Sequence, residues 1–215
     1  MEQKTIRKYT KEQTKNFVKT LITEHYACDA SSVKYVGGGS FGYVYKVEIP
    51  VFPHKLIVKA CRTGGMHKGE ANALKVLGES TLIHVPIVYF TFDANDDIPM
   101  DFIVEEYVSG TDCFTDFRKL FKSKRKKQRF ADNVVKALAH WHSITNDKFG
   151  TLSNPEYDNW LDFYKPFAKD ILDTAVQMNK DGKINDKTIK TMQIAWKNFD
   201  RIFCEPIGHA SLIHG

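Results

Sequence analysis

The stretch Val36-Gly-Gly-Gly-Ser-Phe-Gly-Tyr-Val-Tyr-Lys46 decides the fold of this chain. Three of its glycines have the spacing G-x-G-x-x-G, which nucleotide-binding proteins of several folds share. The segments around them, Ser32–Val36 and Tyr43–Ile49, are rich in β-branched and aromatic residues, and the second alternates with period two. Both features are typical of strands. The sequence therefore predicts a hairpin with a glycine-rich turn.

The segment after the glycines separates the possible phosphate-binding motifs. A dinucleotide-binding fingerprint is followed by a helix, whereas a strand is expected here. A Walker loop has Lys-Ser/Thr after its last glycine, and this chain has Tyr43-Val44. What remains is a glycine-rich hairpin that covers nucleotide phosphates, or a hairpin turn without a ligand. Glycine suits the first because it permits positive φ and a close approach of N–H groups to phosphate.

Lys59 lies within the apolar run Leu56–Ala60 and favours the phosphate-binding interpretation. A lysine inside such a strand is costly unless its ammonium reaches a partner. Glu70 follows eleven positions later in an expected helix. A lysine–glutamate pair of this kind positions nucleotide phosphates in kinases. The alternative is a strand lysine that reaches water and an unrelated surface glutamate.

Composition and charge exclude several classes of protein. The 215 residues are 42% hydrophobic and 27% charged, which is too apolar for a disordered chain. No apolar run approaches the ~18 residues that span a membrane, and the first residues have no signal-peptide core. The four cysteines form no C-x-x-C pair, which argues against zinc and a disulfide framework. We expect a cytoplasmic protein without a membrane partner.

The order of the expected elements gives the fold class. Strands fill the first half and helices the second, so we predict an α+β fold of two lobes with a five-stranded antiparallel sheet. The lobes are expected to be residues 1–108 and residues 109–215. The expected strands are Ser32–Val36, Tyr43–Ile49, Lys55–Cys61, Ile87–Phe92 and Phe102–Val108, and the expected helices are residues 10–26, His67–Gly78, Phe130–Ile144, Asp158–Ala175 and Lys187–Phe203.

The end of the fifth strand is the expected linker between the lobes. Backbone groups of Glu106, Tyr107 and Val108 are placed to bind a purine edge there. The purine would lie in a slot with apolar walls. The expected wall residues are Val44, Ile57 and Val104.

Taken together, these segments resemble the aminoglycoside phosphotransferase superfamily, the small-molecule branch of the protein-kinase-like fold, which includes fructosamine, choline and homoserine kinases. The matching segments are Gly37-Gly-Gly-Ser-Phe-Gly42, Ile57-Val-Lys59, Gly69-Glu-Ala-Asn-Ala-Leu74, Phe102-Ile-Val-Glu-Glu-Tyr-Val-Ser-Gly110, Ala137-Leu-Ala-His-Trp-His142 with Phe149-Gly150, and Leu212-Ile-His-Gly215. The last looks like the opening of the family's catalytic loop, His-Gly-Asp-x-x-x-x-Asn.

The resemblance implies a role for each matched residue. The nucleotide would be ATP, with Lys59 on its α/β-phosphates, Glu70 orienting Lys59, and His214 bracing the catalytic loop. The triphosphate would lie under Gly37, Gly38, Gly39, Ser40, Phe41 and Gly42. Mg²⁺ would be required, but the family's metal ligands and catalytic aspartate come after the last residue, Gly215. We therefore expect a chain that stops short of a full kinase and is itself inactive, whose complete form phosphorylates a hydroxyl of an aminoglycoside, a sugar amine or a choline-like molecule.

Two other functions stay open. The first is a non-catalytic nucleotide-binding or scaffold module. The second is a nucleic-acid binder that uses the basic cluster at 118–129, although no aromatic residue is interleaved in its densest part, Lys122–Arg129. A solvated loop that leads into a helix explains the cluster better, so no nucleic-acid partner is expected.

Overall fold

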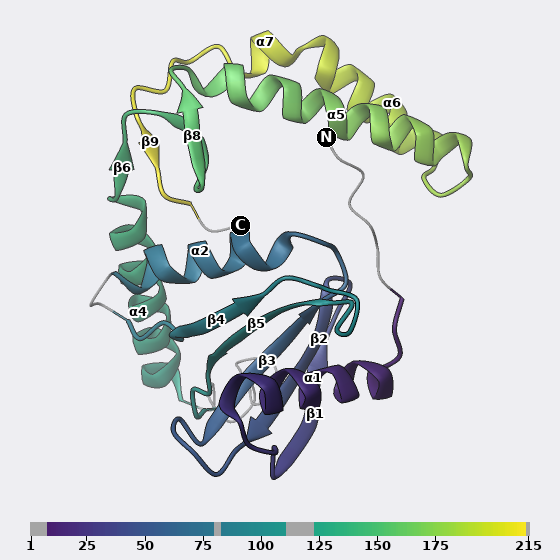
Figure 1. Cartoon of the computed structure of the whole chain (residues 1–215). Helices are drawn as coiled ribbons and strands as arrows, with labels where there is room; N and C mark the ends of the chain where they lie inside the picture. Colours follow the sequence, from purple (N-terminus) through teal and green to yellow (C-terminus); the bar gives the residue numbers. More distant parts are fainter. Residues whose placement is uncertain (1–7, 80–82, 111–122, 214–215) are drawn as a thin grey trace. The chain divides into compact units, whose positions relative to one another are not determined.

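The computed structural model describes residues 8–79, 83–110 and 123–213 (Figure 1). The chain forms two compact units, Met1–Leu138 and Ala139–Gly215. They divide within helix α4 (Lys124–His142). The lobe boundary expected from the sequence lies earlier, between residues 108 and 109, and it stays a prediction.

The first unit is built on a five-stranded antiparallel sheet, as the sequence predicts. The strands follow the order β1-β2-β3-β5-β4, so β5 lies between β3 and β4. Each pair runs antiparallel, and β1 carries an extra residue at Val36 where its register with β2 shifts. The strands are β1 (Ser32–Gly38), β2 (Gly42–Glu48), β3 (Lys55–Cys61), β4 (Val88–Phe92) and β5 (Asp101–Glu106).

Helix α1 (Lys11–Tyr26) covers one face of the sheet and closes the main core. Thr10 and Gln13 form a capping box, which satisfies backbone N–H groups at the start of the helix. The buried face of α1 consists of Thr14, Val18, Leu21 and Ile22. Burial of this apolar face holds the helix on the sheet. The core residues contributed by the sheet are Tyr45, Val47, Leu56, Val58, Ala60, Phe102 and Val104.

Helix α2 (Met66–Gly78) is attached to the sheet much less tightly than α1. The structure describes all of its residues, and His67 alone is buried. Apolar side chains of α2 and of the segment 85–91 line an open groove of about 600 Å³ between the helix and β4. Most of the hydrophobic stabilisation of the first unit therefore comes from the α1 face.

The second unit is helical, with two small sheets that the sequence analysis did not predict. The expectation of helices alone after residue 108 was wrong, because a tight turn at Leu152-Ser153 pairs two neighbouring segments and a further pair joins segments that are distant in the sequence. The small sheets pair β6 (Thr145–Asn146) with β9 (Ala210–Ser211) and β7 (Phe149–Thr151) with β8 (Asn154–Tyr157).

Helices α5 (Trp160–Lys180), α6 (Asp186–Lys197) and α7 (Phe199–Ile202) complete the second unit. The predicted helix Lys187–Phe203 is interrupted at Asn198, which is the C-cap of α6 and the N-cap of α7. Aromatic rings hold these helices together, since Tyr164 of α5 packs 6.1 Å from the ring of Phe199. Among the described residues, no helix is both long and apolar enough to cross a membrane.

Candidate functional site

Alternation along the strands puts Lys59 on the sheet face opposite the α1 core. In β3, Leu56, Val58 and Ala60 are buried in that core, so Ile57 and Lys59 point the other way. Helix α2 supplies a partner on this second face. The Lys59 Nζ lies 2.7 Å from Oε1 of Glu70, so the structure brings together the two residues that the sequence pairs.

A second carboxylate, which the sequence analysis missed, also binds this lysine. Glu105 Oε1 lies 3.0 Å from the Lys59 Nζ, and the Glu105 side chain is only 6% exposed. Its other oxygen, Oε2, is buried and has no hydrogen-bond partner among the described residues. The sequence feature that could have identified Glu105 is a charged residue at an interior position of an apolar strand. The same feature identified Lys59.

Burial and pairing act in opposite directions on this group of charges. Burial lowers the pKa of Lys59, but the hydrogen bond to Glu70 and the charge of Glu105 outweigh it, so the pKa is raised. Burial raises the pKa of Glu105, and the nearby Lys59 offsets only part of that rise. Pairing therefore outweighs burial in its effect on the pKa of Lys59, whereas burial outweighs pairing in its effect on the pKa of Glu105.

The glycine-rich hairpin joins β1 and β2 beside this lysine, because Val44 pairs with Lys59 across the sheet. The expected positive φ at these glycines was wrong, since Gly37, Gly38, Gly39 and Gly42 all lie outside that region. Two of them are required by close packing instead. A Cβ on Gly38 would lie 2.5 Å from the carbonyl oxygen of Gly42, and a Cβ on Gly42 would overlap the carbonyl of Ala60.

Gly37 and Gly39 face open space, where a Cβ would meet nothing within 4 Å. At the tip of the hairpin, Ser40 is exposed and the Phe41 side chain is 67% exposed. The Gly39 N–H donates to the Gly42 carbonyl, and the Arg62 N–H donates to the Phe41 carbonyl. Protein packing thus explains Gly38 and Gly42 but leaves Gly37 and Gly39 without a structural requirement.

One of the three residues expected to line the purine slot was assigned to the wrong face of the sheet. Val104 pairs with Val58 and belongs to the α1 core, so its side chain lies on the opposite face from Lys59. A shift of one position along a strand moves a side chain to the opposite face of the sheet. The sequence alone does not show which face meets the core. Val44 and Ile57 keep the expected side, and Ile103 replaces Val104 there because it pairs directly with Lys59.

Strand β5 ends at Glu106, two residues before the end of the predicted strand, so Tyr107 and Val108 follow as irregular chain. The Glu106 N–H donates to the Ile87 carbonyl at 2.8 Å. Its carboxylate accepts from His84 Nε2 at 2.9 Å. The Glu106 N–H is therefore already used within the protein, which leaves the backbone after it for contact with a ligand.

Two predicted features lie partly or wholly outside the described residues. His214 is outside them, as are the first members of the basic cluster, so nothing is stated of their structure. The described part of the cluster, Lys124–Arg129, is exposed and forms the start of α4. The expectation that it forms a loop was wrong, because long charged side chains are good helix formers when they stay in solvent.

No protein-family model matches the sequence, and no curated protein matches it significantly. Solved structures do resemble the chain. A protein from Thermobifida fusca assigned as a fructosamine-3-kinase is 18% identical, with a TM-score of 0.54 over 92% of this chain and 66% of its own. Spectinomycin phosphotransferase APH(9)-Ia, solved with ADP and spectinomycin, is 14% identical, with a TM-score of 0.45 over 88% of this chain and 54% of its own.

The chain thus spans less than two thirds of the length of either structure. At 92% of the chain, the first match extends into both units. At this level of identity the likeness is one of fold. It agrees with the resemblance inferred from the motifs. The chain therefore shares the protein-kinase-like fold of the structure assigned as a fructosamine-3-kinase.

Proposed function

We propose that this chain binds ATP and forms the nucleotide-binding part of a kinase that phosphorylates a hydroxyl of a small molecule. One observation carries the proposal. Lys59 is a cation on a largely apolar strand, on the sheet face away from the main core, held by Glu70 and Glu105 beside a glycine-rich hairpin. A charged group is kept in such a place when it has an anionic ligand to position.

In this proposal the ammonium of Lys59 binds the α/β-phosphates and Glu70 fixes its direction. Lys59 is 28% exposed, so phosphate oxygens reach it without displacing the core. The exposed tip at Ser40 and Phe41 covers the phosphates. The open space around Gly37 and Gly39 lets phosphate oxygens approach the backbone there.

The purine would lie against Val44, Ile57 and Ile103, with its edge on the backbone after Glu106. Backbone recognition suits a planar ligand that offers one donor and one acceptor on the same edge. Because the Glu106 N–H is occupied by Ile87, the Glu106 carbonyl and the Val108 N–H are the groups we assign to the purine edge.

Mg²⁺ supplies charge neutralisation between phosphate groups in kinases. Near Lys59, both Glu70 and Glu105 already bind the ammonium, so we assign no magnesium ligand to either of them. The acceptor hydroxyl belongs to an aminoglycoside, a sugar amine or a choline-like molecule. Within the part of the chain that the structure describes, no acceptor site distinguishes these three.

Calorimetric titration of the chain with ATP and with ADP tests the proposal. The variant Lys59→Met is expected to lower nucleotide affinity at least tenfold, or about 1.4 kcal/mol. Lys34→Met is the matched control, because Lys34 is an exposed lysine on β1. Equal affinities for the Lys59→Met variant and the wild type would overturn the proposal.

A non-catalytic nucleotide-binding module shares the same binding behaviour. It differs in phosphoryl transfer, which a screen of hydroxyl acceptors with the longest natural form of the protein measures directly. A nucleic-acid binder predicts an affinity that falls steeply with salt and does not change in Lys59→Met.

A further inference from the structure

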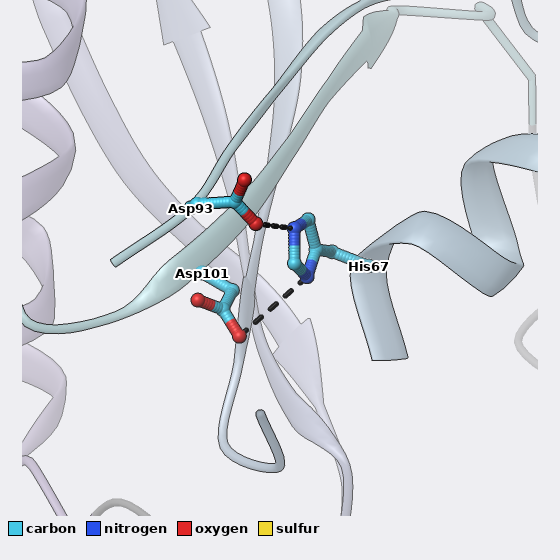
Figure 2. A group of neighbouring side chains, drawn as sticks. All are labelled: His67, Asp93 and Asp101. Atoms are coloured by element: carbon cyan, nitrogen blue, oxygen red, sulfur yellow. Dashed lines mark hydrogen bonds and ion pairs between the residues drawn. The ribbon is translucent and has the colours of Figure 1, made fainter. Parts of the chain in front are cut away.

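His67 lies between two carboxylates that come from separate elements (Figure 2). Its Nε2 is 2.8 Å from Oδ1 of Asp93, which follows β4. Its Nδ1 is 3.5 Å from Oδ2 of Asp101, the first residue of β5. His67 and Asp101 are both almost fully buried, whereas the Asp93 side chain is 65% exposed.

The two carboxylates face opposite nitrogens of the ring, and this geometry bears on which nitrogens carry a proton. A neutral imidazole has one N–H and one lone pair. A lone pair that faces a carboxylate is repelled by it, so a neutral ring would satisfy only one of Asp93 and Asp101. A doubly protonated ring presents an N–H to each carboxylate, although only Nε2 makes a hydrogen bond, and the buried Nδ1 has no hydrogen-bond partner among the described residues. At 3.5 Å the contact with Asp101 is an ionic contact rather than a well-formed hydrogen bond, which also suits a charged ring.

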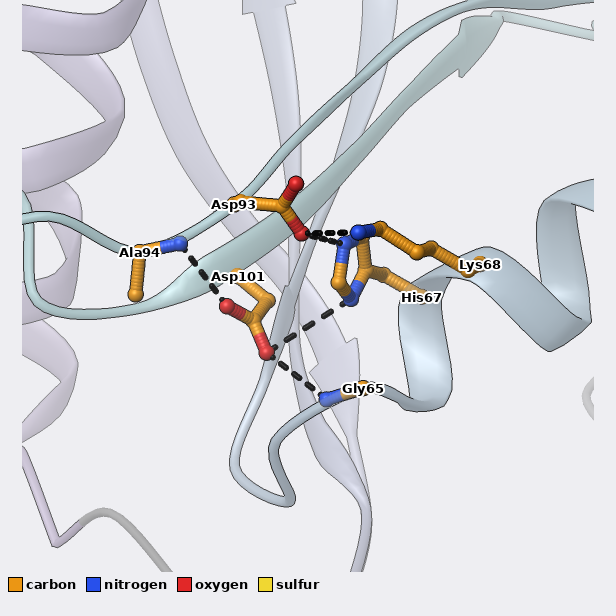
Figure 3. Close-up of polar contacts among 6 residues, drawn as sticks. All are labelled: Gly65, His67, Lys68, Asp93, Ala94 and Asp101. Carbon is orange, nitrogen blue, oxygen red and sulfur yellow. Dashed lines mark hydrogen bonds and ion pairs between the residues drawn. The ribbon is translucent and has the colours of Figure 1, made fainter.

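The surrounding charges agree with this assignment. Lys68 also faces the cluster, and its Nζ lies 2.8 Å from Asp93 Oδ1 (Figure 3). Asp101 accepts from the backbone N–H of Gly65 at 2.9 Å and from that of Ala94 at 2.8 Å. Both carboxylates therefore act as acceptors of several hydrogen bonds, as ionised carboxylates do.

A metal ion explains the same three residues less well. A metal binds one ring nitrogen of a histidine, and the lone pairs of the two nitrogens point in divergent directions. One potential ligand atom of each of the three residues lies within 4.8 Å of the others, but Asp93 already binds Lys68 and Asp101 already accepts two backbone N–H groups. The arrangement fits an imidazolium ion held between two carboxylates.

This cluster joins the start of helix α2 to the sheet. Gly65 is the N-cap of α2, at φ 77°, and glycine has no side chain with which to cap the helix. Asp101 accepts the Gly65 N–H instead, and His67 is the one buried residue of α2. Glu70 stands one helical turn after His67 and meets Lys59.

We propose that His67 is a positioning residue, which in its imidazolium form anchors α2 on the sheet and thereby holds Glu70 against Lys59. The effect on ligand binding rests on the proposed nucleotide-binding function. The anchor itself is a property of the fold. Without it, α2 keeps few buried contacts, so the helix moves and the lysine loses the partner that directs it towards phosphate.

The charge of His67 is measured first, on the wild-type chain. Long-range ¹H–¹⁵N NMR at neutral pH is expected to show both ring nitrogens of His67 protonated. A neutral tautomer would overturn the proposal. Addition of Zn²⁺ or EDTA is expected to leave the spectrum and the thermal unfolding unchanged, and a metal-dependent stabilisation would overturn it as well.

The coupling to Glu70 is measured with a double-mutant cycle. His67→Gln, Glu70→Gln and the double variant are titrated with ADP, with His140→Gln, an exposed histidine on α4, as the control. His67→Gln is expected to lower ADP affinity at least threefold in the wild type and less than twofold in the Glu70→Gln background. Equal losses in both backgrounds would mean that His67 acts on the ligand by another route.

Hydrogen exchange separates failure of this inference from failure of the proposed function. Amide exchange in Met66–Gly78 is expected to be faster in His67→Gln than in His140→Gln, whether or not the chain binds a nucleotide. If the wild type does not bind ADP but α2 still loosens, the anchor stands and the proposed function fails. If α2 exchanges equally in both variants, the anchor is disproved.

Discussion

The buried carboxylate of Glu105 lies 3.0 Å from the Lys59 ammonium, which also bonds to Glu70 at 2.7 Å. One cation thus faces two carboxylates on the sheet face that we assign to a polyanionic ligand. With both carboxylates ionised, the summed charge of Lys59, Glu70 and Glu105 is negative and repels phosphate. The raised pKa of Glu105, caused by burial, lowers the cost of neutralising this site.

The pH dependence of stability tests this charge arrangement. A carboxyl group with a raised pKa binds more protons in the folded state, so its contribution to stability falls as pH rises from the unfolded value of 4.5 to the raised folded value. The wild type should therefore lose stability relative to Glu105→Gln across this window. Urea unfolding of both proteins between pH 4 and pH 7 measures the difference. A constant difference would show that burial does not perturb Glu105.

Removal of the lysine should leave Glu105 without its compensating charge. Lys59→Met is expected to lower the free energy of unfolding at pH 7 by about 1–3 kcal/mol, because a buried acceptor loses its partner. The double variant Lys59→Met/Glu105→Leu should recover most of the loss, since it replaces the pair with apolar groups. Denaturant unfolding of the single and double variants measures both effects. A loss that persists in the double variant would locate the stabilisation elsewhere, for example in the contact with Glu70.

Local patterns were enough to predict the sheet and one side-chain pair of the site. The alternation of apolar residues in β2 and the apolar run around Lys59 identified strands, and the helical period after His67 identified α2 with Glu70. These signals act over a few residues. They do not fix which face of a strand meets the core, which is why Val104 was assigned to the wrong side.

The parts that were missed depend on contacts between distant segments. Glu105 became a partner of Lys59 only because β5 lies next to β3, and strand order is not encoded in either strand alone. The cluster around His67 unites Asp93 and Asp101 through the turn between β4 and β5. Glycine is likewise required at positions 38 and 42 because backbone atoms of other residues pack closely against Gly38 and Gly42.

The glycines of the hairpin offer a matched pair of variants. Gly42→Ala is expected to destabilise the first unit by about 1–3 kcal/mol, because the added Cβ overlaps the Ala60 carbonyl and the strands must separate. Gly39→Ala adds a Cβ in open space and should change stability by less than about 0.5 kcal/mol. Its nucleotide affinity should nevertheless fall several-fold if phosphates lie there. Thermal unfolding of both variants measures the effect on packing, and ADP titration measures the effect on binding. An unchanged ADP affinity in Gly39→Ala would show that the phosphates do not bind beside Gly39.

Tyr45 links the sheet to α1, and its hydroxyl gives the last prediction. The side chain is fully buried, and its hydroxyl donates to the Lys11 carbonyl at 2.7 Å. Tyr45→Phe should lower the free energy of unfolding by about 1 kcal/mol, because the donor is lost while the ring still fills the core. Burial raises the pKa of Tyr45 to about 12. Between pH 10 and pH 12, Tyr45 therefore keeps its phenol proton in the folded state and loses it in the unfolded state. The wild type should therefore lose stability relative to Tyr45→Phe over that range. Denaturant unfolding at pH 8 and pH 11 measures both effects, with Tyr35→Phe, whose side chain is 40% exposed, as the control. Equal pH dependence in the Tyr45 and Tyr35 variants would show that the hydroxyl of Tyr45 is not shielded from water.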